Sequence, residues 1–124
     1  MSNNNNPSDL AQEEKKLSEF ISGNSHSFDT GIASSIGLHA AIVYNHIFYW
    51  LKYNAYKPDI EKIQDKVWMY ESNKKISEFL GYLSEDEVNR ALKKLVESGL
   101  LLKDNFNKNK FDRTYWYTIP DQEK

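Results

Sequence analysis

Two amphipathic segments stand out in the second half of the chain, Lys74 to about Leu80 and Ser84 to Ser98. In the second segment Val88, Leu92 and Leu95 recur at three- and four-residue spacing, with polar residues between them. This spacing places the apolar side chains on one face of a helix. The pattern therefore predicts two consecutive helices joined by a short turn.

Small polar residues and glycines mark the ends of these helices. We expect Ser72 or Asn73 to cap the first helix and Gly81 to end it. Ser84 opens the second helix, and Glu87 three residues later completes a capping box. These signals predict a helix-turn-helix.

Short β-prone runs surround the two helices. Val67 to Tyr70 precedes them, and Leu100 to Lys103 and Thr114 to Ile119 follow them, after a glycine at Gly99. The polar segment Asn105 to Asp112 lies between the last two runs and predicts the turn of a hairpin. A strand, two helices and a hairpin in this order predict a winged helix.

The first half of the chain predicts further helices. Ser8 can cap a helix from Asp9 to about Ile21, with an apolar stripe that includes Leu17 and Phe20. The segment Gly37 to Tyr53 is apolar in every helical direction. Such a helix is either central in the core or also part of an oligomer interface.

Other segments of the first half show weaker patterns. His26 to Ser35 has no clean period and predicts a short strand or loop. Asn54 to Gln64 contains Pro58 and alternating charges, and predicts a long exposed loop. The asparagine-rich residues 1–8 predict a disordered leader, residues 9–119 one domain, and residues 120–124 a short tail. The expected fold class is α+β, a winged helix-turn-helix with an extra N-terminal helix and a small antiparallel sheet.

Composition narrows the classes of function. The 124 residues suffice for one core, and the absence of cysteine excludes disulfides, thiol nucleophiles and thiolate metal sites. No apolar run approaches the roughly 20 residues of a membrane span, and the N-terminus lacks a signal-peptide pattern. We therefore expect a cytoplasmic protein with no membrane partner.

Charge is unevenly distributed along the chain. The net charge of −2 counts against DNA binding by bulk charge. The segment Lys66 to Ile119, however, carries ten Lys and Arg against eight Asp and Glu, whereas the remainder carries six against ten. The basic residues thus lie where a winged helix contacts a phosphate backbone.

The second helix of the pair would enter a DNA groove. Arg90 can read guanine and Asn89 adenine, while Lys93 and Lys94 suit phosphates. The alternative is an ordinary solvated helix face, and the acidic run that begins at Glu85 favours it because carboxylates repel phosphates. Glu85, Asp86 and Glu87 also suit the positive end of the helix dipole.

The hairpin, or wing, is the second candidate contact. Lys108, Lys110 and Arg113 can reach phosphates or a minor groove, unless they form only a solvated hairpin tip. Asn105, Asn107 and Asn109 suit a turn and can hydrogen-bond to a backbone, and Phe106 and Phe111 are expected to staple the hairpin base. The residues that we expect to contact DNA are Lys74, Lys75, Asn89, Arg90, Lys93, Lys94, Lys108, Lys110 and Arg113.

The sequence gives little support for single-strand binding, metal binding or catalysis. The aromatic residues of the predicted strands suit cross-strand packing better than stacking on single-stranded nucleic acid; they are Trp68, Tyr70, Tyr115, Trp116 and Tyr117. His39 and His46 are two helical turns apart, roughly 10 Å, which is too far to share one metal ion. With no phosphate-binding glycine loop and no nucleophile motif, we expect no enzyme activity, no cofactor and no small-molecule substrate.

The runs WMYES, LSEDEVNRALKKLVESGLL and NFNKNKFDRTYWYTI, with YWL near Trp50, resemble the N-terminal winged-helix domain of phage and plasmid replication proteins. The resemblance covers about Gly37 to Ile119 and is most specific from Ser84 onward. It implies double-stranded DNA as the partner, commonly at a replication origin. The chain departs from this family in the acidic start of its second helix. Three hypotheses about function remain. The protein is a replication or plasmid-maintenance protein that dimerises, a transcriptional regulator, or a winged helix used for protein–protein contact.

Overall fold

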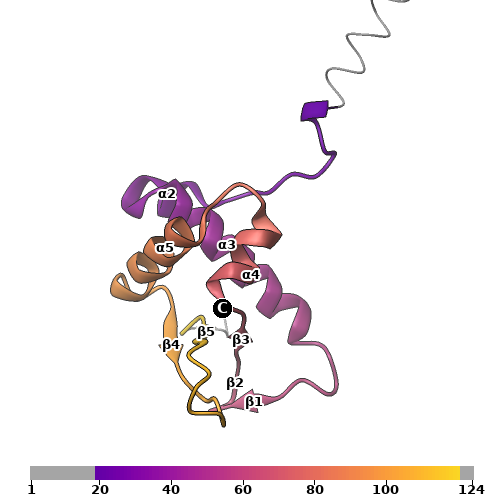
Figure 1. The fold of residues 1–124 in the computed structure, drawn as a ribbon, viewed down its shortest axis with the longest axis vertical. Coiled ribbons are helices and arrows are strands. Elements are labelled where there is room, and N and C mark those ends of the chain that lie inside the picture. Colours follow the sequence, from indigo (N-terminus) through magenta and orange to yellow (C-terminus); the bar gives the residue numbers. More distant parts are fainter. Residues whose placement is uncertain (1–18, 121–124) are drawn as a thin grey trace, which may run out of the picture.

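The structure is a computed structural model, and it describes residues 19–120. The predicted leader, most of the predicted helix from Asp9 and residues 121–124 lie outside the described residues. Helices form one end of the molecule in Figure 1, and short strands form the other. None of the described helices is both long enough and apolar enough to cross a membrane.

Helix α2 (Thr30–Ile36) corrects the expectation of a strand or loop between His26 and Ser35. The Asp29 side chain caps it by accepting a hydrogen bond of 3.0 Å from the Ile32 amide. The helix is only seven residues long and rich in small residues, so it has little apolar periodicity of its own. Ile32 and Ile36, four residues apart, pack against the core and hold it in place.

Helix α3 (Leu38–Asn54) confirms the long apolar helix and explains its all-round pattern. One side, which includes Val43, Ile47 and Leu51, is buried against α5 and the sheet. Other side chains, among them Phe48 and Tyr53, remain exposed. The helix is therefore central in the core and also presents aromatic residues on the surface.

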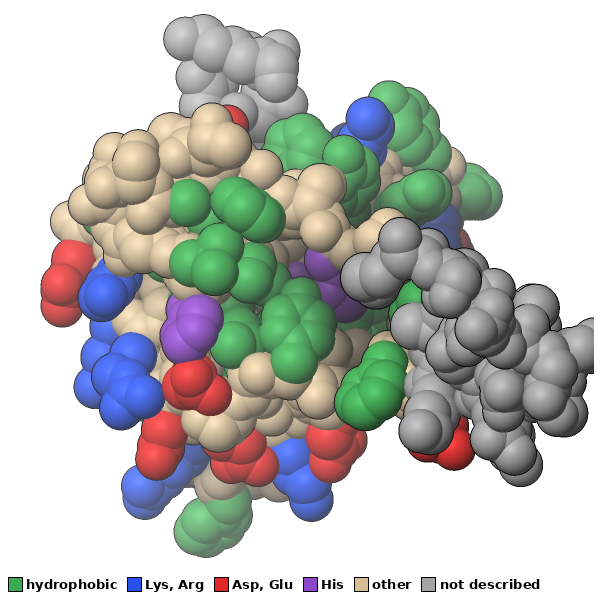
Figure 2. All heavy atoms as spheres, turned by 90° about the horizontal axis from the view of Figure 1, so that it is seen from above, with side chains coloured by type: hydrophobic (Ala, Val, Ile, Leu, Met, Phe, Trp, Pro, Cys, Tyr) green, Lys and Arg blue, Asp and Glu red, His purple; other side chains and the backbone are tan. Residues whose placement is uncertain are grey.

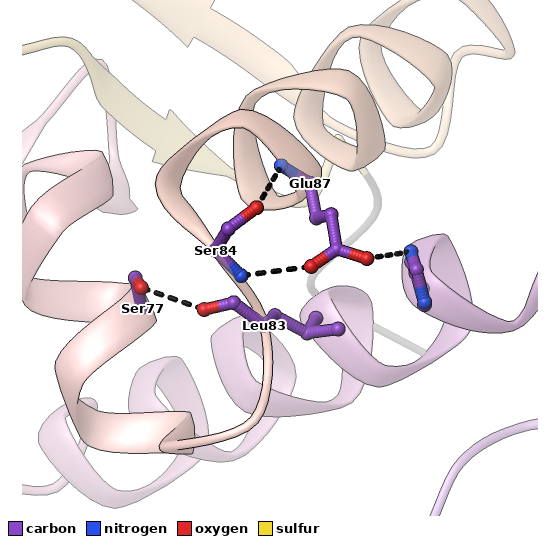
Figure 3. A network of polar contacts seen from close by, with 5 residues as sticks. Ser77, Leu83, Ser84 and Glu87 are labelled. Atoms are coloured by element: carbon purple, nitrogen blue, oxygen red, sulfur yellow. Dashed lines mark hydrogen bonds and ion pairs between the residues drawn. The ribbon is translucent and has the colours of Figure 1, made fainter.

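Helices α4 (Asn73–Leu80) and α5 (Glu85–Glu97) form the predicted helix-turn-helix. Gly81 ends α4 at φ +81°, a left-handed conformation that glycine adopts without a Cβ clash. The Ser77 hydroxyl donates a 2.6 Å hydrogen bond to the Leu83 carbonyl and closes the turn (Figure 3). The angle between the two helices is thus held by local bonds as well as by the core.

The predicted capping box of α5 is present. The Glu87 amide donates to the Ser84 hydroxyl at 3.1 Å, and the Ser84 amide donates to the Glu87 carboxylate at 3.0 Å (Figure 3). These bonds lower the pKa of Glu87, with His39 and Arg90 adding a smaller attraction. The carboxylate at the start of α5 is therefore part of the fold.

The lowered pKa of Glu87 predicts a loss of stability in acid. Ionised Glu87 stabilises the folded state above its ordinary pKa of 4.5, and this contribution disappears as the pH falls through the lowered folded-state value. Because Gln can still accept the capping bond, we expect Glu87→Gln to reduce the decline in unfolding free energy between about pH 5 and about pH 3. Urea unfolding of the two proteins across that range measures the decline. Superimposable pH profiles would contradict this role.

The predicted strand Val67 to Tyr70 is divided between two small sheets. Residues of β1 (Lys62–Ile63) pair with β2 (Lys66–Val67), whereas β3 (Met69–Tyr70) belongs to the second sheet. The prediction of a loop up to Gln64 is therefore wrong at its C-terminal end, because Lys62 and Ile63 form a strand there. The chain then reverses through Gln64 and Asp65, both at positive φ. Trp68 marks the break, and its indole donates a 3.0 Å bond to the Ile63 carbonyl.

The second sheet has the order β3–β5–β4, all antiparallel, with β4 (Leu102–Asp104) and β5 (Trp116–Thr118) forming the wing. Both wing strands begin two residues later than predicted. The amides of Leu100 and Leu101 bond to the Leu95 carbonyl and close the end of α5, so they cannot join the ladder. Gly99, at φ +82°, provides the predicted left-handed turn there.

Candidate nucleic-acid interface

A groove of about 680 Å³ lies between α5 and the wing. Helix α4 contributes Lys74, α5 contributes Asn89 and Lys93, and the wing contributes Lys103 and Arg113. Residues separated by almost 40 positions in the sequence thus line one surface. The helix-turn-helix and hairpin, predicted separately, meet here.

The groove has mixed charge. Four basic side chains line it together with Glu71, Glu85 and Glu97. Glu71 lies 3.6 Å from the His46 imidazole, and Glu85 belongs to the first turn of α5, where the helix dipole favours a carboxylate. The modest positive excess predicts weaker attraction for polyanions than a uniformly basic groove would have.

Helix geometry separates the predicted α5 residues into two groups. Asn89 and Lys93, four residues apart, line the groove. Arg90 and Lys94 instead border a separate hollow of about 220 Å³ beside the α2–α3 junction. A Cβ on Gly37 would lie 3.7 Å from the Lys94 Nζ, which places that ammonium near the junction. The predicted reading residues therefore do not form one face.

Asn89 already has a partner within the protein. Its Oδ1 accepts a 3.2 Å hydrogen bond from Asn73 Nδ2, at the first residue of α4. An asparagine that reads adenine uses both its oxygen and its nitrogen. Asn89 must therefore give up its bond to Asn73 before it can make that bidentate contact.

The remaining predicted cations lie in different places. Lys75 borders a separate apolar groove of about 640 Å³ between α3 and α4, not the α5–wing groove. Lys108 and Lys110 are exposed at the wing tip. Of the nine predicted contacts, Lys74, Asn89, Lys93 and Arg113 share the α5–wing groove.

The wing is held by one central asparagine. Asn107 Nδ2 donates to the carbonyls of Asp112 and Thr114 at 3.0 and 2.7 Å, and Trp116 donates to Asn107 Oδ1 at 2.7 Å. The amide of Asn107 itself donates to the Asn105 side chain at 2.9 Å. The wing asparagines, predicted for a turn, thus bond to the protein's own backbone.

A bond between strand β3 and the wing adds to this scaffold. The Tyr70 hydroxyl donates to the Asp112 carboxylate, which also accepts a 3.0 Å bond from the Thr114 amide. These two bonds lower the pKa of Asp112, and the bond to Asp112 raises the pKa of Tyr70. The Asp112 carboxylate therefore stabilises the hairpin through hydrogen bonds and is not a free charge at the wing tip.

The two wing phenylalanines behave differently. Phe106 packs edge-on against Trp68 and Trp116, with ring centroids 4.9 and 5.7 Å away, and confirms the predicted staple. Phe111 does not staple the hairpin, because its side chain is 91% exposed. The turn places residue 111 at the tip, beyond reach of the hairpin base.

The remaining strand aromatics divide between core and surface. Trp68 and Tyr117 are buried, and burial raises the pKa of Tyr117 to about 12. Tyr115 is exposed, and the Lys103 ammonium lies 4.1 Å from its ring centroid. Lys103 and Tyr115 both line the groove. Lys103 was missed as a candidate, although its polar position on a predicted wing strand was a signal for it, and Tyr115 was assigned to cross-strand packing.

Two of the three histidines lie near carboxylates, while His26 is bonded to the Tyr82 hydroxyl at 2.7 Å. His39 lies 3.6 Å from Glu87, and His46 lies 3.6 Å from Glu71. Among residues 19–120, no group of three or more metal-binding side chains comes together.

Comparison with known proteins identifies the class of fold. No family model and no curated protein matches the chain. Among solved structures, it is similar to one described as the N-terminal domain of a DNA binding protein. The similarity covers 89% of this chain and 79% of the other, with a TM-score of 0.59 and 16% sequence identity. The chain has an α+β winged helix-turn-helix fold.

Proposed function

We propose that this protein binds double-stranded DNA through the α5–wing groove. One observation carries the proposal: basic side chains from α4, α5 and the wing line a single groove beside the second helix of a helix-turn-helix. In proteins of this fold, that helix enters the major groove while neighbouring elements hold the phosphate backbone. The DNA-binding protein whose domain has a similar fold supports the same assignment.

The groove suits a sugar–phosphate strand. With α5 in the major groove, the strand at its border runs between α5 and the wing, where Lys93 and Arg113 face it from opposite sides. Lys74 and Lys103 extend the same surface. The wing tip then lies over the adjacent minor groove, where Lys108 and Lys110 contact further phosphates.

We expect phosphate contacts to dominate over base reading. The acidic first turn of α5 faces DNA with like charge, the oxygen of Asn89 is bonded to Asn73, and Arg90 borders another hollow. Each of these features weakens direct readout of base edges. Specificity would then arise chiefly from the shape and flexibility of the DNA.

We propose replication or maintenance of a phage or plasmid, in the cytoplasm, as the biological setting. The resemblance of the Ser84 to Ile119 segment to replication proteins supports this setting. A transcriptional regulator would use the same fold and the same groove. Origin DNA and promoter DNA of the source replicon, compared as competitors for binding, separate these two roles.

Salt dependence tests the proposed DNA binding. Phosphate contacts by the four basic groove side chains and by Lys108 and Lys110 predict that affinity for a labelled random-sequence duplex falls roughly 1,000-fold between about 50 and about 200 mM salt. Fluorescence anisotropy titrations at the two concentrations measure the change. If no binding is seen at low salt with an excess of protein, the proposal is wrong.

Protein contact is a second candidate, and exposed apolar surface favours it. Figure 2 shows hydrophobic side chains gathered on the face that carries α2 and the α4–α5 turn. The exposed hydrophobic residues of these segments and their neighbours include Phe28, Leu38, Phe79 and Tyr82. A homodimer that buries this face is compatible with DNA binding through the opposite side of α5. Sedimentation of the protein without DNA tests for that dimer.

A further inference from the structure

The wing tip presents an apolar ring among cations. Phe111 is 91% exposed and lies directly after Lys110 and two residues before Arg113, with Lys108 also exposed nearby. A single exposed phenylalanine is common on protein surfaces and needs no function by itself. Its position matters here, because Arg113 already lines the α5–wing groove.

Hydrogen bonds fix the backbone at Phe111 and at the residue that follows it. The Phe111 amide donates a 2.9 Å hydrogen bond to Asn109 Oδ1, and the Asp112 amide donates a 3.1 Å bond to the Asn109 carbonyl. Asp112 is in turn bonded to Tyr70 and to the Thr114 amide. The turn that carries the ring is thus fixed by hydrogen bonds, which limits the backbone entropy lost when the ring binds.

The other rings of the hairpin are already engaged. Phe106 packs against Trp116 and Trp68, Tyr115 lies beneath the Lys103 ammonium, and Tyr117 is buried in the core. Phe111 differs from them by projecting from the tip with cations on both sides. An apolar wedge flanked by phosphate-binding residues is the arrangement with which minor-groove proteins unstack a base step.

We infer that Phe111 is a wedge that enters the minor groove and partly unstacks one base step, so that the protein bends its DNA. This inference rests on the proposed DNA binding and specifies how the bound DNA is deformed. Lys108, Lys110 and Arg113 would hold the phosphates on either side of the opened step. Flexible pyrimidine–purine steps unstack most easily and are the preferred targets.

DNA fits this tip better than an apolar protein surface does. A protein partner that buried Phe111 would also have to remove water from the neighbouring lysines, at an electrostatic cost. DNA offers stacked bases to the ring and phosphates to the lysines at the same time. The charge around the ring therefore selects a nucleic acid.

Bending and unstacking are measured separately from binding. A duplex of about 30 base pairs carries a fluorophore at each end for energy transfer, and 2-aminopurine at a central pyrimidine–purine step reports unstacking. We compare the parent with Phe111→Ala, Phe111→Leu and Tyr56→Ala. Tyr56 is 83% exposed on the loop after α3, so its variant removes a similarly exposed ring elsewhere.

The parent should raise the 2-aminopurine fluorescence and shorten the end-to-end distance, as a bend of roughly 20–90° requires. Phe111→Ala should abolish both signals and bind roughly tenfold more weakly, which is the scale expected for one buried ring. Phe111→Leu should restore part of the bend, and Tyr56→Ala should match the parent.

Two results would overturn the wedge. One is bending and unstacking by Phe111→Ala equal to the parent's, which would show that the ring does not deform the DNA. The other is a parent that binds DNA and changes neither signal. Both leave the proposed DNA binding intact, whereas a parent that binds no duplex in the same titration removes the proposed function and the wedge together.

Discussion

The double variant Lys93→Ala/Arg113→Ala should bind duplex DNA roughly 50-fold more weakly than the parent at about 100 mM salt. The two side chains face the α5–wing groove from α5 and from the wing. Each phosphate contact releases close to one counterion, which at this salt concentration is worth roughly an eightfold change in affinity. The slope of log affinity against log salt should also become shallower by about 1.8. Anisotropy titrations at several salt concentrations measure both quantities.

The chain offers a matched control for this variant. Arg90→Ala/Lys94→Ala removes one arginine and one lysine, and thus the same charge, from the hollow beside the α2–α3 junction. We expect its affinity to stay within about threefold of the parent's, because the remaining effect is long-range and screened by salt. An equal loss in both double variants would show that net charge, not the groove, governs binding.

Leu95→Ala should lower the free energy of unfolding by about 2–5 kcal/mol. Leu95 is fully buried on the inner face of α5, which packs extensively against α3. Removing its isobutyl group loses apolar burial and leaves a cavity that the surrounding helices can fill only in part. For a domain of this size the melting temperature should fall by roughly 10 °C or more. Urea unfolding followed by circular dichroism gives the free-energy difference.

Leu102→Ala is the control for this loss. Leu102 lies on β4 with 40% of its surface exposed, so the same chemical change opens little or no cavity. We expect a change below about 1 kcal/mol. If Leu95→Ala were no less stable than Leu102→Ala, the packing of α5 against α3 would be described wrongly.

The sequence predicts what local bonds and a strong periodicity determine. Helix α5 has a clear apolar stripe, a capping box at Ser84 and a terminating glycine at Gly99, and each is found as predicted. Helix α4, with its cap at Ser72 and its end at Gly81, follows the same rules. These elements carry their own start and stop signals within a few residues.

Elements that depend on distant partners were predicted less well. Helix α2 is too short to show a period and depends on the packing of Ile32 and Ile36 against the core. The packing of α2 cannot be read within its own segment. The two-residue strand β1 was missed for a local reason, because its partner β2 lies only two residues away and the turn between them, at Gln64 and Asp65, has no glycine to signal its positive φ.

In the candidate site, too, the sequence predicts local properties of residues better than their arrangement in space. The sequence identifies Lys93, Arg90 and Arg113 as polar and outward, but it does not say which of them share a surface. The position of α5 between the α2–α3 junction and the wing separates Arg90 from Lys93 and joins Lys93 to Arg113. Lys103 was missed for the same reason, since the strand pairing carries it to the groove.

Mapping of the bound surface by NMR tests the central claim most directly. Amide chemical shifts are recorded while the protein is titrated with a short duplex at low salt. We expect the largest changes at Lys74, Asn89, Lys93, Lys103 and Arg113 and through the wing tip around Phe111, with small changes along α2 and the start of α3. Changes concentrated on α2, α3 and the hollow that contains Arg90 and Lys94 would contradict the groove as the DNA-binding site.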